Sequence, residues 1–175
     1  MQTKIHIGLI GAGRIGRIHA ENLRCMPQVT VKTVMDLYPE QISEWAESAS
    51  IPNVTDDVEQ IFADPEIDAV WICSSTDTHP DLIMQAAQAG KHVFCEKPIS
   101  FDLACTRQAV EVMKQAGLQL QVGFNRRFDA NFSRVRELIA GGEIGEPHII
   151  KITSRDPAPP PYDYIQVSGG LFVDM

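Results

Sequence analysis

The first candidate for chemistry in this chain is the segment GLIGAGRIG, which holds a G-x-G-x-x-G pattern at Gly11, Gly13 and Gly16. The pattern follows an apolar run typical of a buried strand and opens an amphipathic stretch typical of a helix, the context that dinucleotide binding requires. The first glycine permits the tight turn, the second lets backbone N–H groups approach a pyrophosphate, and the third lets the helix pack closely. We therefore expect Gly11, Gly13, Arg14, Ile15 and Gly16 to bind a dinucleotide at a helix amino terminus.

An acidic residue, Asp36, ends the second apolar run, 20 residues after Gly16. A carboxylate at this place accepts hydrogen bonds from the ribose hydroxyls of the adenosine half. It would repel the 2′-phosphate of NADP(H), and no arginine follows directly, so we expect NAD to be the cofactor. The alternatives are a structural glycine turn that binds no ligand and an ordinary acid at the end of a strand.

Apolar runs alternate with amphipathic stretches along most of the chain, and short links join them. The expected strands are residues 4–11, 29–36, 68–75, 91–98 and 118–124. The expected helices are residues 14–26, 39–49, 56–64, 79–90 and 100–117, the last with Ser100 as its N-cap. Strands that alternate with helices predict βαβ units, and therefore a doubly wound parallel sheet covered by helices on both faces.

The pattern changes near residue 123. A helix is expected at residues 128–142, and a longer, more amphipathic strand at residues 148–155, typical of a sheet with one covered face. We therefore predict an NAD-binding α/β domain at residues 1–122. The beginning of a second, incomplete α/β domain is predicted at residues 123–175.

Composition narrows the classes of function. The chain has 175 residues and a formal net charge of −8, which argues against a protein that binds a nucleic-acid backbone. No run approaches the roughly 20 apolar residues of a membrane span, and the amino terminus has no signal-peptide pattern, so we expect a cytoplasmic protein. No spacing of histidines, cysteines or carboxylates indicates a metal site, and the four cysteines are interpreted as free thiols.

A second motif lies in the segment STDTHPDLIMQAAQAGKHVFCEKPIS. It resembles the T-x-x-H … A-G-K-H-V … E-K-P signature of the Gfo/Idh/MocA oxidoreductases, the family of glucose–fructose oxidoreductase and inositol dehydrogenase. Together with the glycine turn and Asp36, the resemblance covers essentially the whole chain. The later segments VGFNRRFDANF and SRDPAPPPYDY…SGGLFVDM resemble the inositol-dehydrogenase-like branch more loosely.

The resemblance implies a Rossmann domain followed by an α/β domain with an open, mostly antiparallel sheet. It also implies a bound nicotinamide cofactor, a polyol or sugar substrate between the domains, and a homodimer or homotetramer of the full-length protein. In the family the lysine of E-K-P, here Lys97, touches the reacting hydroxyl, and a cis bond before Pro98 is expected. A D-x-x-x-H segment supplies an acid, here Asp174, and a histidine that would follow Met175, so the chain is interpreted as truncated.

Lys97 also suits alcohol oxidation on physical grounds. Removing a hydride from a secondary alcohol releases the hydroxyl proton, which a base must accept in the transition state. A fixed cation near the developing alkoxide lowers the barrier further. Lys97 follows a predicted parallel strand, at the edge where such sheets bind ligands. We expect Lys97 to orient the hydroxyl and assist proton transfer, whereas a histidine is the better base near neutral pH.

The same segments hold further candidates for cofactor contact, namely Ser74, Thr76, His79, Glu96 and Lys97 itself. His79 begins a predicted helix, where a structural cap is as good an interpretation as a cofactor contact. Glu96 is expected to face the cofactor or a backbone group. His19 lies within the apolar arc of the first helix and is interpreted as a core or cleft-edge histidine.

The later part of the chain holds the candidates for substrate binding. Asn125 and Arg127 lie where the resemblance implies a crossing into the second domain, and an arginine fork suits hydroxyl groups. Arg155 could close over a polyol or could pair with Asp156. Asp174 is interpreted as a carboxylate that binds a substrate hydroxyl or orients the histidine, with an ordinary strand-end acid as the alternative.

These residues predict NAD-dependent oxidation of a secondary alcohol. The resemblance implies a cyclic polyol as the substrate, with myo-inositol favoured and another sugar or cyclitol as the alternative. A non-catalytic NAD-binding regulatory module is the alternative from another class. Such a module would keep the glycine turn but need not keep E-K-P or Asp174.

Overall fold

The computed structural model describes residues 4–155, 158, 159, 162 and 165. The chain divides into a first unit that ends at Gly123 and a second unit that begins at Phe124. The predicted acids Asp156 and Asp174 lie outside the described residues.

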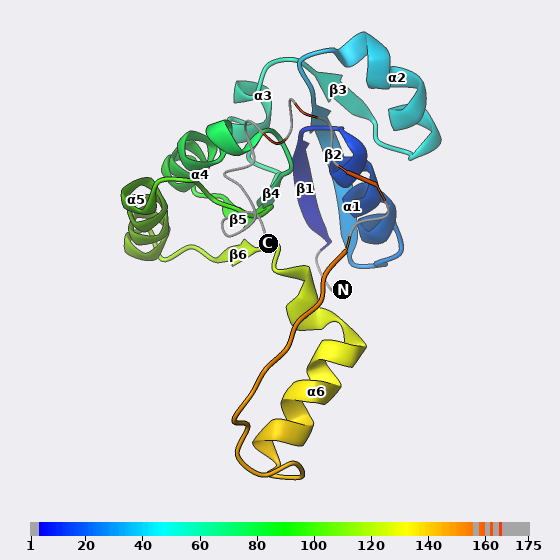
Figure 1. Ribbon diagram of the computed structural model, residues 1–175. Helices are drawn as coiled ribbons and strands as arrows, with labels where there is room; N and C mark the ends of the chain where they lie inside the picture. The colour runs from blue at the N-terminus through cyan, green and yellow to red at the C-terminus, as the bar shows by residue number, and fades with distance from the viewer. Residues whose placement is uncertain (1–3, 156–157, 160–161, 163–164, 166–175) are drawn as a thin grey trace. The chain divides into compact units, whose positions relative to one another are not determined.

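The first unit is built on a parallel sheet whose described strands follow the order β3-β2-β1-β4-β5-β6 (Figure 1). The strands are β1 (Ile5–Ile10), β2 (Val29–Met35), β3 (Asn53–Thr55), β4 (Ala69–Ile72), β5 (His92–Cys95) and β6 (Leu120–Val122). This order is that of the doubly wound Rossmann fold, in which the chain reverses its direction of growth between β1 and β4. The predicted α/β fold class is therefore confirmed for this unit.

Helices cover both faces of the sheet. The α-helices of the first unit are α1 (Arg14–Arg24), α2 (Pro39–Ser48), α3 (Glu59–Phe62), α4 (His79–Gln88) and α5 (Leu103–Gln115), with a 3-10 turn η1 (Thr76–Thr78) before α4. One hydrophobic cluster joins the sheet to α1 and α2, and another joins it to α3, α4 and α5 (Figure 1). Among the described helices, none combines the length and apolar character needed to cross a membrane.

Local signals set where these helices begin and end. Gly90 and Gly117 follow α4 and α5 with φ values of +71° and +69°, the left-handed conformation in which glycine ends helices. The predicted N-cap Ser100 is wrong, because α5 is capped by the carboxylate of Asp102, which accepts hydrogen bonds from the next turn. Ser100 instead accepts a hydrogen bond from the amide of Asp102.

Two elements differ from the sequence prediction. Strand β3 was not predicted, because its three residues are too few for an alternating pattern, and only its pairing with β2 defines it. The predicted strand at residues 148–155 is not formed within the described chain. A strand needs the backbone groups of a neighbouring strand, and the described residues provide none for this segment.

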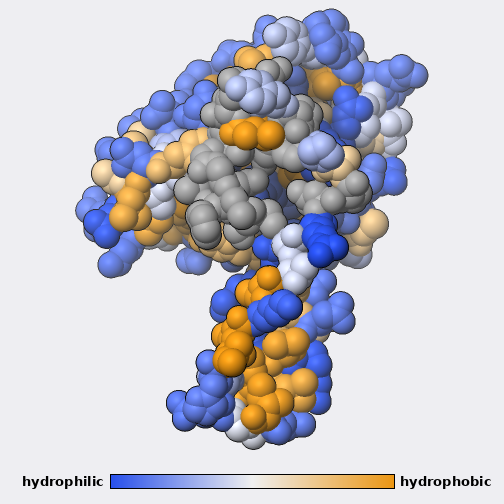
Figure 2. Space-filling view, viewed as in Figure 1, coloured by the Kyte–Doolittle hydropathy of each residue, from blue (hydrophilic) through white to orange (hydrophobic). Residues whose placement is uncertain are grey.

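The second unit contains a 3-10 turn η2 (Asn125–Phe128) and the helix α6 (Ala130–Ala140), within the predicted range 128–142. Asp129 caps α6 by accepting hydrogen bonds from the amides of Asn131 and Phe132. No residue of this described helix is buried. Apolar surface gathers over α6 (Figure 2). The exposed apolar residues of this unit include Phe128, Phe132, Val135, Ile139, Ile144, Ile149, Ile150 and Ile152.

Candidate active site

The glycine turn lies at the carboxyl end of β1, at the switch point of the sheet, where this fold binds dinucleotides. Gly11 has a φ of +92°, a conformation that L side chains rarely adopt. A side chain at Gly16 would overlap the carbonyl oxygen of Gly11, so glycine is needed there for α1 to pack against the turn. At Gly13 a Cβ atom would meet nothing within 4 Å, so the backbone faces open space in which a pyrophosphate fits.

The amino end of α1 is available for an anion. Within the described chain no side chain caps this helix, and its first turn contains no acid. The first backbone N–H groups of a helix have no partner inside it and carry a partial positive charge. Arg14 is exposed and Ile15 is half-buried at this end. The residues present therefore fit the pyrophosphate of a dinucleotide.

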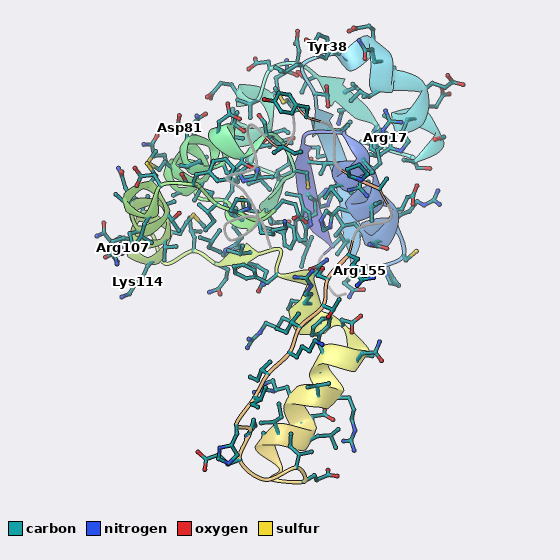
Figure 3. The ribbon with its side chains drawn as sticks, viewed as in Figure 1. Arg17, Tyr38, Asp81, Arg107, Lys114 and Arg155 are labelled. Carbon is teal, nitrogen blue, oxygen red and sulfur yellow. The ribbon has the colours of Figure 1, made fainter. Side chains whose placement is uncertain are left out.

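Arg17 holds the glycine turn in place, a role that no motif in the sequence predicts. Its Nε atom donates a hydrogen bond to the carbonyl oxygen of Ala12 at 2.9 Å. Its guanidinium group lies over the ring of Trp45 in α2, 5.0 Å from the centroid. Figure 3 labels Arg17 on α1. Nothing in the sequence pairs Arg17 with Trp45, so this contact depends on the packing of α1 against α2.

Asp36 follows β2, as predicted, and its carboxylate is fixed beside the glycine turn. Oδ2 accepts a hydrogen bond from the amide of Ala12 at 2.8 Å, and Oδ1 accepts one from the amide of Tyr38 at 3.2 Å. Asp36 is half-buried, whereas Tyr38 is exposed (Figure 3). A carboxylate oxygen has room for further donors, so Asp36 can still accept hydrogen bonds from ribose hydroxyls.

The loop after β4 forms the second side of the site. The hydroxyls of Ser74 and Thr78 lie 2.7 Å apart, and Thr76 is half-buried in η1. His79 is only 1% exposed. Its Nδ1 lies 2.9 Å from the carbonyl oxygen of Pro98, and its Nε2 lies 3.1 Å from that of Ser74. His79 is not a helix cap, because the N-cap of α4 is Thr78 and no side chain among the described residues caps this helix. Its ring instead contacts two backbone carbonyl groups.

The E-K-P segment forms the third side of the site. Strand pairing aligns Ile10 with Ile72 and Ile72 with Cys95. The segments that follow these three residues therefore leave neighbouring strands at the same edge of the sheet. Glu96 and Lys97 are half-buried there, and the bond from Lys97 to Pro98 is cis, as expected.

The carboxylate of Glu96 accepts two hydrogen bonds at this edge of the sheet. Its Oε1 accepts a hydrogen bond from Nε2 of His19 at 2.8 Å, and its Oε2 accepts one from the amide of Lys97 at 3.2 Å. Burial raises the pKa of Glu96, but the hydrogen bonds from His19 and from the Lys97 amide outweigh it. The pKa of Glu96 therefore lies below its ordinary value, and the group is a carboxylate at neutral pH.

Two thiols lie beside this carboxylate. Burial, and next the charge of Glu96, raise the pKa of Cys95 to about 12. The same two causes, in the same order, raise the pKa of Cys73 still further. A thiolate is the reactive form of cysteine. Cys73 and Cys95 are free thiols, as predicted, and their raised pKa values make them inert rather than nucleophilic.

The other candidates belong to the second unit. Asn125 and Arg127 lie in η2 and are exposed, and Arg155 is also exposed (Figure 3). The structure thus brings together the glycine turn, Asp36, the loop after β4 and the E-K-P segment within the first unit. The substrate-binding roles of Asn125, Arg127 and Arg155 stay predictions. The described residues contain no group of three or more histidine, cysteine or acidic side chains that could hold a metal ion.

Comparison with known protein families identifies the family to which the first unit belongs. The profile of the Gfo/Idh/MocA family, described as an oxidoreductase family with an NAD-binding Rossmann fold, matches residues 5–124. The chain belongs to the Gfo/Idh/MocA oxidoreductase family. The family binds NAD, and NAD is the cofactor that the glycine turn and Asp36 fit.

Curated members of the Gfo/Idh/MocA family are similar to this chain along its whole length. The myo-inositol 2-dehydrogenase of Thermotoga maritima is 48% identical over 171 residues, which are 98% of this chain and 51% of that protein. The inositol 2-dehydrogenase of Rhizobium meliloti is 46% identical over 171 residues, again 98% of this chain and 51% of that protein. The chain therefore spans about half the length of the curated relatives that it matches.

Solved structures of the family share the fold. A probable dehydrogenase from Thermotoga maritima superposes with a TM-score of 0.93 at 48% identity, covering 98% of this chain and 51% of that one. A scyllo-inositol dehydrogenase from Lactobacillus casei, solved with NAD(H) and scyllo-inositol bound, superposes with a TM-score of 0.78 at 33% identity. That match covers 82% of this chain and 43% of the other.

Proposed function

We propose that the protein containing this chain is an NAD-dependent dehydrogenase that oxidises a secondary alcohol of a cyclic polyol. The favoured reaction converts myo-inositol to 2-keto-myo-inositol (scyllo-inosose). The observation that supports it is the alignment of the glycine turn, the loop after β4 and Lys97 at three neighbouring strand ends. Relatives named as inositol 2-dehydrogenases, 46% to 48% identical, support the choice of substrate.

The first unit would bind the cofactor and orient the reacting hydroxyl. Gly11, Gly13 and Gly16 would hold the pyrophosphate, and Asp36 would accept hydrogen bonds from the ribose hydroxyls. Bound NAD supplies the nicotinamide carbon that accepts a hydride. Lys97 would orient the substrate hydroxyl, stabilise negative charge on its oxygen and assist the transfer of its proton.

The second unit would bind the rest of the polyol. Asn125, Arg127 and Arg155 carry donors suited to several hydroxyl groups, and all three are exposed in the described structure. Asp174 would bind a substrate hydroxyl or orient the proton-accepting histidine that the family places after it. We assign residues 1–122 to the NAD-binding domain and residues 123–175 to the beginning of the substrate domain.

The surroundings of the reaction are also proposals. A net charge of −8 favours a small-molecule substrate over a nucleic-acid partner. We propose a cytoplasmic protein, because the sequence shows no signal-peptide pattern and no run of membrane-span length. The resemblance to the family implies a homodimer or homotetramer of the full-length protein. Size-exclusion chromatography with light scattering would measure the oligomeric state directly.

Two alternatives make different predictions. A dehydrogenase of the same family for another sugar or cyclitol would keep every first-unit contact and differ only in its substrate. A non-catalytic NAD-binding regulator would bind NAD through the same turn but would have no need of Lys97. The residues on both sides of Lys97 are hydrogen-bonded, so the backbone that carries this lysine is held in place. A regulator would not need such a fixed lysine, and we therefore favour an enzyme.

The decisive experiment follows absorbance at 340 nm with NAD and a panel of polyols, sugars and cyclitols. It uses the longest gene product that contains this chain. We expect NADH to form with myo-inositol. NADH formation with another sugar but not with myo-inositol would contradict the substrate assignment. Binding of NAD without turnover of any alcohol in the panel would favour the regulatory module.

A further inference from the structure

The residues on either side of Lys97 are both anchored to distant parts of the first unit. The side chain of Glu96 is hydrogen-bonded to His19 in α1, 77 residues away in the sequence. The carbonyl group of Pro98 is hydrogen-bonded to His79 at the start of α4. We call these contacts the His19 brace and the His79 brace.

The His19 brace connects the Lys97 turn to the helix that begins at the glycine turn. Nε2 of His19 and Oε1 of Glu96 lie 2.8 Å apart, and each side chain is 22% exposed. The His19 ring lies edge-on to Phe94, with centroids 4.9 Å apart, and Phe94 stacks on Trp71 at 4.9 Å. These aromatic contacts set the direction from which His19 approaches Glu96.

Glu96 passes this constraint to the backbone of Lys97. Its Oε2 accepts a hydrogen bond from the Lys97 amide at 3.2 Å. On its other side the carboxylate packs against Gly123, where an added Cβ atom would come within 2.9 Å of Oε1. A side chain at position 123 would therefore displace the Glu96 carboxylate from its present place.

The His79 brace connects the same turn to the loop after β4. His79 is 1% exposed and places one ring nitrogen 2.9 Å from the Pro98 carbonyl oxygen and the other 3.1 Å from that of Ser74. An apolar side chain would fill a buried space without the cost of burying polar atoms. A histidine that spans two backbone carbonyls instead joins the loops that carry Ser74 and Lys97.

We propose that His19 and His79 are positioning residues that fix the turn carrying Lys97 before substrate binds. The inference rests on the role of Lys97 in the proposed function. The His19 brace starts from α1, whose amino end the cofactor would contact. The His79 brace starts from α4, and its ring also contacts Ser74 in the loop after β4, which the cofactor would contact. The two braces thereby set the Lys97 amine relative to the nicotinamide end of the site.

The ring nitrogens provide a direct spectroscopic test. A carbonyl or carboxylate oxygen only accepts hydrogen bonds, so each brace requires a hydrogen on a defined nitrogen. Nitrogen-15 NMR of the histidine rings in this chain should show a hydrogen on Nε2 of His19 and on Nδ1 of His79. A neutral His79 with its hydrogen on Nε2 would donate to Ser74 rather than to Pro98 and would overturn the His79 brace.

Amide hydrogen exchange separates local positioning from general stability. In the variants His19→Leu and His79→Leu, the amides of Lys97 and Ile99 should exchange about ten-fold faster or more, while those of β1 keep their protection. His92→Gln is the matched control, because His92 lies at the opposite end of β5 and is exposed. Unchanged exchange at Lys97 and Ile99, or equal acceleration across the whole unit, would overturn the proposal.

Kinetics tests the catalytic consequence on a protein that turns over a polyol. Both leucine variants should lower kcat by about 10- to 100-fold, because a small displacement of a reacting group has such an effect. Their affinity for NAD should stay within about three-fold of the wild-type value, because the glycine turn and Asp36 are unchanged and only an interaction made in the transition state is weakened. Unchanged kcat with a loosened turn would overturn the positioning role. If the wild-type protein oxidises no alcohol, the proposed function fails, and the exchange experiment still decides whether the braces exist.

Discussion

The two units of this chain differ in how they bury their apolar residues. The first unit encloses two hydrophobic clusters, one on each face of its parallel sheet. In the second unit the described helix α6 buries none of its residues, and Phe128 and Phe132 are 71% and 52% exposed. A parallel sheet with a helix layer on each face closes its own core, whereas a single helix cannot.

The candidate site residues follow the same division. In the first unit the carboxylates of Asp36 and Glu96 each accept two hydrogen bonds. The two ring nitrogens of His79 lie 2.9 Å and 3.1 Å from backbone carbonyl oxygens. In the second unit Asn125, Arg127 and Arg155 are exposed. The residues that fit the cofactor are thus held by contacts within the first unit alone. We therefore expect substitutions in the two units to have different kinds of effect.

The largest effect is expected at Lys97. Lys97→Ala should lower kcat by roughly 10²- to 10⁴-fold, because the positioned group for the hydroxyl proton is lost. The affinity for NAD, measured by fluorescence titration, should change little, because the glycine turn and Asp36 are untouched. Near-normal turnover by the alanine variant would remove Lys97 from the mechanism.

The next largest effect is a difference between the two units in how much a core-sized truncation lowers the free energy of unfolding. Ile83 is 0% exposed in α4, and Ile83→Ala should lower the free energy of unfolding by about 2–5 kcal/mol. Val135 is 55% exposed in α6, and Val135→Ala should change it by no more than about 0.5 kcal/mol. Urea unfolding of both variants of this chain is the measurement. Equal losses would show that α6 is packed as tightly as the first unit.

A smaller effect should distinguish the second unit in kinetics. Arg127→Ala should raise KM for the polyol about ten-fold, the usual loss for one hydrogen bond from a charged group. The affinity for NAD should remain that of the wild type, since Arg127 lies outside the first unit. Arg136→Ala in exposed α6 is the matched control. If KM stays the same, Arg127 does not bind the substrate.

Asp36 should control the choice between the two nicotinamide cofactors. Asp36→Ala removes the charge that would repel a 2′-phosphate, so the ratio of NAD to NADP affinity should fall by about ten-fold. It also leaves the amide of Ala12 without its partner, so some affinity for NAD should be lost as well. An unchanged ratio in parallel titrations with the two cofactors would contradict the role of Asp36.

The smallest expected effect is a pH dependence that arises from Glu96. Its pKa is lowered in the folded protein, so its contribution to stability is present above the unfolded value, about 4.3, and is lost as pH falls through the folded pKa. Glu96→Gln removes the ionisation. The difference in unfolding free energy between wild type and variant should therefore be larger at about pH 6 than at about pH 3. A constant difference across urea titrations at these pH values would contradict this.

Short-range signals explain what could be predicted. The glycine turn, the strand-ending Asp36 and the helix-ending Gly90 and Gly117 each act on neighbouring residues, and the structure places all of them as expected. Ser100 is the exception at this range, since Asp102 two residues later offers a charged acceptor to the same helix end. Such local signals are enough to predict the fold class and the edge of the sheet at which the candidate site lies.

Long-range contacts explain what could not be predicted. Arg17 over Trp45, and His19 against Glu96, join residues on different elements, and no spacing in the sequence connects them. The three-residue β3 and the unpaired segment 148–155 depend on whether a neighbouring strand is present. Strand propensity alone cannot supply that neighbour.

The sequence by itself therefore determined that this chain forms a Rossmann unit with a glycine turn, an acid at the end of the second strand and a lysine after a parallel strand. These features depend on local backbone conformation and on the alternation of strands with helices. Only the tertiary structure decided which side chains hold Lys97 in place. Its neighbours Glu96 and Pro98 meet His19 and His79 because the switch point of the sheet brings three strand ends together.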